Sequence, residues 1–151
     1  MTDRLTPERR SWLMSRVHSR DTTPERLVRR LVHRLGYRFR LHRRDLPGTP
    51  DLVFPSRRAI IFVHGCFWHR HRGCRKATVP STRKEFWLQK FARNVNRDAT
   101  VREALERAGW RVLIVWECEL RDIDALGPRV LAFLGRTEVR RQCRLTSSTR
   151  R

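Results

Sequence analysis

The stretch DLVFPSRRAIIFVH, residues 51–64, decides the fold, because it contains two short apolar strands joined by a tight turn. Residues 51–54 and 59–63 are rich in β-branched and aromatic side chains, and PSRR at 55–58 is typical of a turn. The pair predicts a β-hairpin. A third apolar stretch, RVLIVW at 111–116, follows a long helical segment, which favours a strand parallel to one hairpin strand.

Helical patterns surround these strands. Thr22 or Thr23 can cap a helix whose first turn holds Pro24, and apolar residues recur at helical spacing up to Gly36. The order α, β, β, β, α, β, α predicts an α/β sandwich on a small mixed sheet flanked by helices. The remaining expected elements are a half-buried strand at 37–42 and helices at 84–108 and 123–134.

Length and composition indicate one domain with one moderate core. The chain has 151 residues, 39% of them hydrophobic, and five tryptophans, which excludes a wholly disordered polypeptide. We expect a basic N-terminal arm or helix at 1–20, the main domain at 21–135, and a basic, loosely ordered tail at 136–151.

The charge balance points to a polyanionic partner. Lysine and arginine number 35 against 15 acidic residues, for a formal net charge of +20. Nucleic acid is the expected partner, with salt-dependent binding, although a merely basic protein is the alternative. The sequence shows neither a membrane-spanning run nor a secretory signal, so we expect a reducing cytoplasm, in which cysteines are more often metal ligands than disulfides.

The segment HGCFWHRHRGC at 64–74 predicts a metal site, since three histidines and two cysteines in eleven residues do not suit a core. Cys66, Cys74 and Cys118 with one histidine would complete a closed, structural Cys₃His zinc site. Zinc would supply the folding energy that a loop with few apolar residues lacks. The alternative is buried free thiols with solvated histidines. Cys143 has no evident partner and is interpreted as a bystander.

Asp51 and His64 form a second constellation, at the ends of the two hairpin strands. A carboxylate there, in a basic protein, can hold Mg²⁺ for phosphodiester cleavage, while a nearby neutral histidine takes the proton of the attacking water. The alternative is that Asp51 only satisfies a turn.

Aromatic residues in polar surroundings form a third feature. Phe67 and Trp68 adjoin in the metal loop, where both cannot easily point into one core, and Trp87 lies in a basic stretch. Such rings can wedge between base pairs, and a mismatched step is cheaper to open. The alternative is that they pack over the loop.

Four strings in order carry a resemblance: LPGTPDLVF at 46–54, FVHGCFWHRH at 62–71, VPSTRKEFWLQK at 79–90 and GWRVLIVWECEL at 109–120. They closely resemble the very-short-patch (Vsr) mismatch endonucleases, over about residues 21–120. The resemblance implies a variant of the restriction-endonuclease core at 21–135 that nicks one strand 5′ of the T in a T:G mismatch. Such mismatches arise when 5-methylcytosine, made by a DNA cytosine-5 methyltransferase, deaminates.

By matching position, Asp51 resembles the family's Mg²⁺-binding carboxylate and His69 its water-activating base. His64 and Glu25 resemble supporting catalytic residues. Val63 stands where members commonly have threonine, and its main-chain oxygen, which any residue offers, would provide the Mg²⁺ contact.

The remaining matched positions concern DNA and zinc. Gly73 can absorb a ligand loop that is one residue longer here than in known members. The implied DNA contacts are the intercalating Phe67, Trp68 and Trp87, with Lys90 and Asn94 at the mismatch, and the implied zinc ligands are Cys66, His71, Cys74 and Cys118.

The resemblance also implies a bacterial, cytoplasmic, nucleoid-associated monomer that acts on T:G-mismatched duplex DNA, with a MutL-type repair protein as a further partner and no membrane contact. The main rival hypothesis is a non-catalytic zinc-dependent DNA-binding module. An RNA-binding protein that stacks bases on Phe67 and Trp68 is the third.

Overall fold

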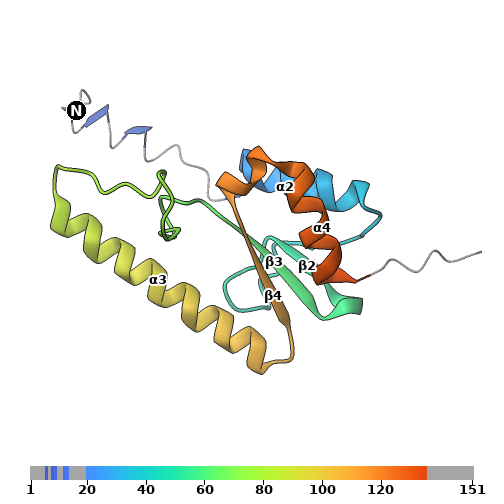
Figure 1. The fold of residues 1–151 in the computed structure, drawn as a ribbon. Coiled ribbons are helices and arrows are strands. Elements are labelled where there is room, and N and C mark those ends of the chain that lie inside the picture. The colour runs from blue at the N-terminus through green and yellow to red at the C-terminus, as the bar shows by residue number, and fades with distance from the viewer. Residues whose placement is uncertain (1–5, 7, 10–11, 14–19, 136–151) are drawn as a thin grey trace, which may run out of the picture.

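The computed structural model describes residues 6, 8–9, 12–13 and 20–135. Four strands form one mixed sheet in the order β1-β2-β3-β4. The first two pairs are antiparallel and the last is parallel, which confirms the predicted hairpin and the parallel strand after it (Figure 1). The strands are β1 (Arg40–Leu41), β2 (Leu52–Phe54), β3 (Ala59–His64) and β4 (Arg111–Trp116).

Helices cover both faces of this sheet. The α2 and α4 helices lie together on one side, and α3 runs along the other (Figure 1). The expected α/β class and order of elements are confirmed. The expected arm at 1–20 falls largely outside the described residues, and the tail at 136–151 falls wholly outside them. The helices are α2 (Thr23–Arg34), α3 (Lys84–Arg107) and α4 (Ile123–Leu134), with short 3₁₀ helices η1 (Pro55–Arg57) and η2 (Glu117–Arg121).

The hairpin sends alternate side chains into two cores, because successive residues of a strand point to opposite faces of the sheet. Leu52 and Ile61 are fully buried in the core beneath α2 and α4. Val53 and Ile60 are buried with Leu105 of α3 on the opposite face. The apolar pattern of residues 51–64 therefore fixes which helix covers which side.

The expected strand at 37–42 is wrong in extent, since only Arg40–Leu41 pairs with β2. Tyr37 is 2% exposed and packs edge-on against Phe54 in the core. Its backbone N–H donates to the Val32 carbonyl at the end of α2. The chain leaving α2 thus stays bonded to the helix and joins the sheet only at Arg40. None of the helices in the described part of the chain is both long and apolar enough for a membrane span.

Leu105→Ala is expected to destabilise the protein by about 2–5 kcal/mol, since it leaves a cavity where α3 meets the sheet. Leu88→Ala removes the same atoms from the same helix, but Leu88 is 46% exposed, and we expect a change within about 0.5 kcal/mol. Urea denaturation of both variants measures the difference. Equal losses would contradict the described docking of α3.

Candidate active site and metal centre

A cavity of about 750 Å³ opens between the start of α2, the end of β3 and the middle of α3. All four residues that the sequence singles out as catalytic line it, together with Val63. The four are Glu25, Asp51, His64 and His69. The fold therefore collects residues far apart in the sequence around one space.

Asp51 lies just before β2, mostly buried, and its Oδ2 accepts a hydrogen bond of 2.7 Å from the Val63 N–H. Burial raises the pKa of this carboxyl to about 6. Within the described residues, no lysine, arginine or histidine forms an ion pair with it. A buried carboxylate without an ion-pair partner fits a hard cation such as Mg²⁺, which prefers carboxylate and carbonyl oxygens.

The imidazoles of His64 and His69 stack, with ring centroids 3.9 Å apart and an interplanar angle of 12°. The Nδ1 of His69 lies 2.6 Å from Oδ2 of Asp98 on α3. This contact places the proton of a neutral His69 on Nδ1, so that its Nε2 is free to accept one. A histidine oriented by a carboxylate has the arrangement of a general base.

His64 is 7% exposed, and burial is the main reason that its pKa falls to about 4, with the neighbouring His69 adding to the effect. It is therefore uncharged at neutral pH. Its ring also meets the edge of Trp116, at a centroid distance of 5.4 Å. The stacked pair is thus held between β4 and α3.

Glu25 also stabilises the start of α2. It is 4% exposed, and its carboxylate accepts hydrogen bonds from the Asp21 N–H, the Thr22 hydroxyl and the Arg29 guanidinium. Thr22 in turn caps the helix by accepting from the Glu25 N–H. The carboxylate is therefore fixed at the cavity wall by the start of α2.

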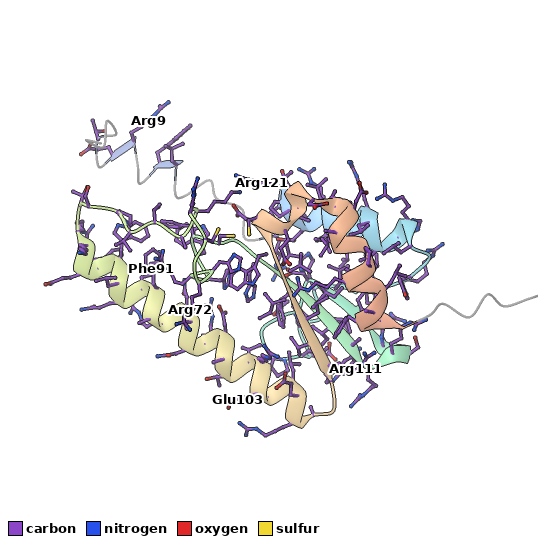
Figure 2. All side chains as sticks on the ribbon, in the orientation of Figure 1. Arg9, Arg72, Phe91, Glu103, Arg111 and Arg121 are labelled. Carbon is purple, nitrogen blue, oxygen red and sulfur yellow. The ribbon has the colours of Figure 1, made fainter. Side chains whose placement is uncertain are left out.

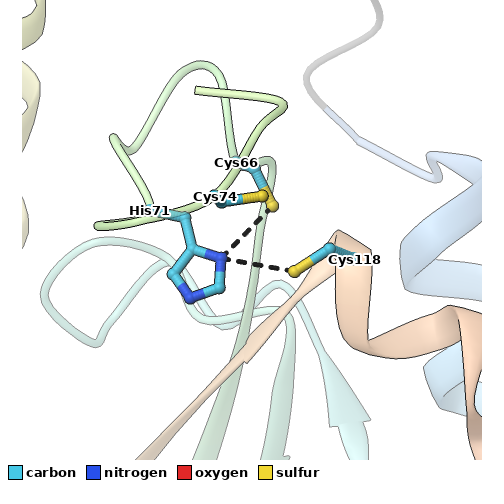
Figure 3. A group of neighbouring side chains, drawn as sticks. All are labelled: Cys66, His71, Cys74 and Cys118. Carbon is cyan, nitrogen blue, oxygen red and sulfur yellow. Dashed lines mark hydrogen bonds between the residues drawn. The ribbon is translucent and has the colours of Figure 1, made fainter. Parts of the chain in front are cut away.

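The four predicted zinc ligands converge (Figure 3). The Nδ1 of His71 lies 3.6 Å from the Cys66 sulfur and 3.3 Å from that of Cys118, and all four ligand atoms lie within 4.8 Å of one another. Such separations suit tetrahedral zinc, with bonds of about 2.3 Å to sulfur and 2.0 Å to nitrogen. The set Cys₃His completes a closed site with no open position, which fits a structural metal.

The chain around this cluster supports the same conclusion. His71 stacks on Trp116 at 4.3 Å, which the alternative of solvated histidines does not explain. Gly73 has a φ of 74°, in the left-handed region that favours glycine, which lets the loop turn back towards Cys74. Burial raises the pKa of the Cys66 thiol to about 12, and zinc binding would displace that proton.

Phe67 and Trp68 do share one cluster, contrary to expectation. Their rings meet edge to face at 5.0 Å, and both contact Trp87, which is 7% exposed. Phe91 of α3 closes the group (Figure 2). The physical reason is that the metal loop and α3 build a small aromatic core of their own, outside the sheet. Phe67 and Trp68 stay half-exposed at its surface.

Lys90 and Asn94 support this cluster from α3. The Lys90 ammonium lies 5.3 Å from the Trp68 ring centroid and 5.5 Å from that of Trp87, in cation–π contact. Asn94 donates to the Trp68 carbonyl at 3.1 Å and also lines the cavity. Lys90 therefore packs on the aromatic cluster, and Asn94 links that cluster to the cavity.

Positive charge surrounds the site. Arg20, Arg97 and Arg102 line the cavity itself. Exposed arginines also project from the metal loop and η2, as the labelled Arg72 and Arg121 illustrate (Figure 2). Phosphate groups of a polyanion would find counter-charges on several elements.

Sequence reasoning missed Asp98 and Trp116. Asp98 follows Asn94 by four residues on a helix, so both project to one side, but an acid in the pattern NRDAT has the appearance of a solvated surface residue. Trp116 was assigned only to a buried strand. Its contacts with His64 and His71 depend on the register of β4 against β3.

Comparison with known proteins adds independent information. The family described as DNA mismatch endonuclease Vsr matches residues 2–76. The chain is 58% identical over 134 residues to the type II nicking enzyme V.XorIIP of Xanthomonas oryzae pv. oryzae, covering 89% of this chain and 98% of that protein. It is 46% identical over 122 residues to the DNA mismatch endonuclease Vsr of Escherichia coli, covering 81% and 78%.

Cys118→Ser is expected to release the bound metal and lower the melting temperature sharply, because ligand loss removes folding energy. Cys143→Ser is the matched control. Cys143 lies outside the described residues, and the sequence assigns it no ligand role. Elemental mass spectrometry measures the zinc content of both variants, and thermal unfolding measures their melting temperatures. Full zinc content with an unchanged melting temperature in Cys118→Ser would disprove its role.

Proposed function

Because the chain belongs to the DNA mismatch endonuclease Vsr family, we propose that it nicks one strand of duplex DNA 5′ of the T in a T:G mismatch, with Mg²⁺. As a member it is a DNA endonuclease of the nicking type, acting on DNA. One observation carries the finer proposal: a single cavity holds a buried carboxylate and two stacked imidazoles, one of them bound to a second carboxylate.

Asp51 and the main-chain oxygen of Val63 would hold the magnesium ion. When bound, Mg²⁺ stabilises the charge that develops on the scissile phosphate and makes water more acidic. The donor set supports this assignment, since the Asp51 carboxylate is held in place by the Val63 N–H and has no ion-pair partner among the described residues.

His69 takes the proton from the attacking water at Nε2. Asp98 keeps its ring in the required tautomer through Nδ1 and stabilises the imidazolium that forms. His64 remains neutral, stacks on His69 and restricts its orientation. Glu25, held by three hydrogen bonds, would be a fixed carboxylate at the cavity wall, beside the phosphate.

The aromatic cluster selects the substrate. Phe67 and Trp68 enter the base stack from their half-exposed positions. Trp87 packs behind them or enters the base stack after them. Unstacking costs about a few kcal/mol per step, and less at a mismatch, so the wedge favours mismatched DNA. Lys90 and Asn94 contact the mismatch from the base of the same cluster.

A T:G mismatch arises by deamination of 5-methylcytosine, so the proposal links this enzyme functionally to a DNA cytosine-5 methyltransferase. The MutL-type partner and the monomeric state follow from the family resemblance alone. A non-catalytic zinc-dependent DNA-binding module would use the same loop and basic surface. It gives no reason, however, for the Asp51, His69 and Asp98 arrangement.

Asp51→Asn tests the proposal directly. We expect nicking of a T:G duplex to fall by about 10³-fold, because loss of the metal ligand removes several kcal/mol of transition-state stabilisation. Binding to the same duplex should change little. Asp45→Asn is the matched control, since Asp45 is exposed and pairs only with Arg43 among the described residues. Gel assays with and without EDTA measure nicking. Full activity of Asp51→Asn would disprove the role of Asp51 as a metal ligand.

Asp98→Asn is expected to slow single-turnover nicking by about 10²-fold without weakening DNA binding, because it removes the charge that supports the protonated His69. Glu103→Gln is the control on the same helix, where Glu103 is exposed and pairs with Arg107. A rate for Asp98→Asn within twofold of the control would remove Asp98 from the mechanism.

A further inference from the structure

Asp21, Glu25 and His42 converge next to the cavity, each with one potential ligand atom, and these atoms lie within 4.8 Å of one another. Two carboxylates and an imidazole could hold a divalent cation. The position is taken by the Arg29 guanidinium. Its Nη1 donates to Asp21 at 2.5 Å, and its Nη2 lies 3.1 Å from Glu25 and 3.0 Å from the His42 Nε2.

Arg29 stands behind the cavity wall. Glu25 and His42 line the cavity, but Arg29 is absent from its lining. Its side chain is only 14% exposed, and its Nε is buried without a hydrogen-bond partner. A mostly buried guanidinium is costly unless carboxylates compensate its charge. The cluster is therefore built around this cation.

The backbone supports the same arrangement. Asp21 has a φ of 55° and His42 a φ of 44°, in the left-handed region that side-chain-bearing residues seldom adopt. Each such residue costs about 1 kcal/mol or more and persists only where its surroundings enforce it. Both chain segments turn in this way at the point where their side chains meet Arg29. The contacts of Arg29 with Asp21 and His42 hold these two segments together.

We infer that Arg29 is a built-in cation that replaces a metal ion at Asp21, Glu25 and His42 and so positions Glu25 at the cavity wall. It acts through Glu25 and is a positioning residue. The inference rests on the proposed function, in which Glu25 stands beside the scissile phosphate. Guanidinium suits this duty because it stays charged at all working pH values and offers several donors in a rigid fork.

Arg29→Ala should slow single-turnover nicking by about 10- to 100-fold, since displacing a group by about 1 Å can cost about 10²-fold. The dissociation constant for the mismatched duplex should stay within about threefold, because Arg29 does not line the cavity. Arg30→Ala is the matched control. It removes the same charge from the exposed neighbouring position of α2 and should leave the rate within about threefold.

Metal binding provides a readout that does not depend on activity. In an Asp51→Asn background, Arg29→Ala should bind one additional Mn²⁺ per chain, counted by electron paramagnetic resonance, and Glu25→Gln should abolish it. In the otherwise wild-type enzyme, raised Mn²⁺ should partly restore the nicking rate of Arg29→Ala. Arg29→Lys keeps the charge without the fork and should give an intermediate rate.

An Arg29→Ala rate equal to that of Arg30→Ala, or no additional Mn²⁺, overturns the inference. If Arg29→Ala does not fold, the nicking rate of Arg29→Lys tests the inference instead. A wild-type rate for Arg29→Lys would contradict the positioning role of Arg29. A parent enzyme that leaves T:G duplexes intact disproves the proposed function instead, and the Mn²⁺ count then still tests Arg29 by itself.

Discussion

The parallel pairing of β3 with β4 is the constraint on which both sites depend. Its register ends with His64 opposite Trp116, at the point where each strand leaves the sheet. The Trp116 ring meets His64 on the cavity side and stacks on His71 of the metal cluster. Two residues further, Cys118 reaches the same cluster. A shift of one residue would turn Trp116 to the other face and separate the two sites.

The loop between β3 and α3 has its own means of stability. It lies outside the two cores that the sheet builds with its helices, and an aromatic cluster together with four converging ligand residues, which would be joined by a bound metal, packs it instead. Asn94 and Lys90 attach that loop to α3, and His69 attaches it through Asp98. One helix thus contacts both His69 and the aromatic cluster. Trp68 and Asn94 belong to both places, because each also lines the cavity.

Local sequence patterns were sufficient for the helices, for three of the four strands and for the three cysteines of the cluster, because periodicity, caps and residue types with few uses are visible one segment at a time. They left the histidine of the cluster open, and only the family resemblance pointed to His71. The strand at 37–42 was overestimated, since Tyr37 is drawn into the core by contacts that alternation cannot reveal. The contacts of Asp98, Trp116 and Arg29 were not predicted, for a related reason. An acid or arginine on a basic helix has the same pattern whether it faces water or a buried partner, and only tertiary packing distinguishes the two.

The distribution of charge then gives the site its character. The chain carries a formal net charge of +20, yet the cavity wall contains Glu25, Asp51, Asp98 and Glu117. A surface that attracts phosphates and an interior that repels them would conflict if the acids had no compensation. Each acid has a different direct partner: Arg29 for Glu25, His69 for Asp98, Lys76 for Glu117, and for Asp51 a backbone N–H. Asp51, which lacks an ion-pair partner among the described residues, is therefore the acid that a bound cation would stabilise most. A cation at Asp51 would also attract a phosphate to this carboxylate.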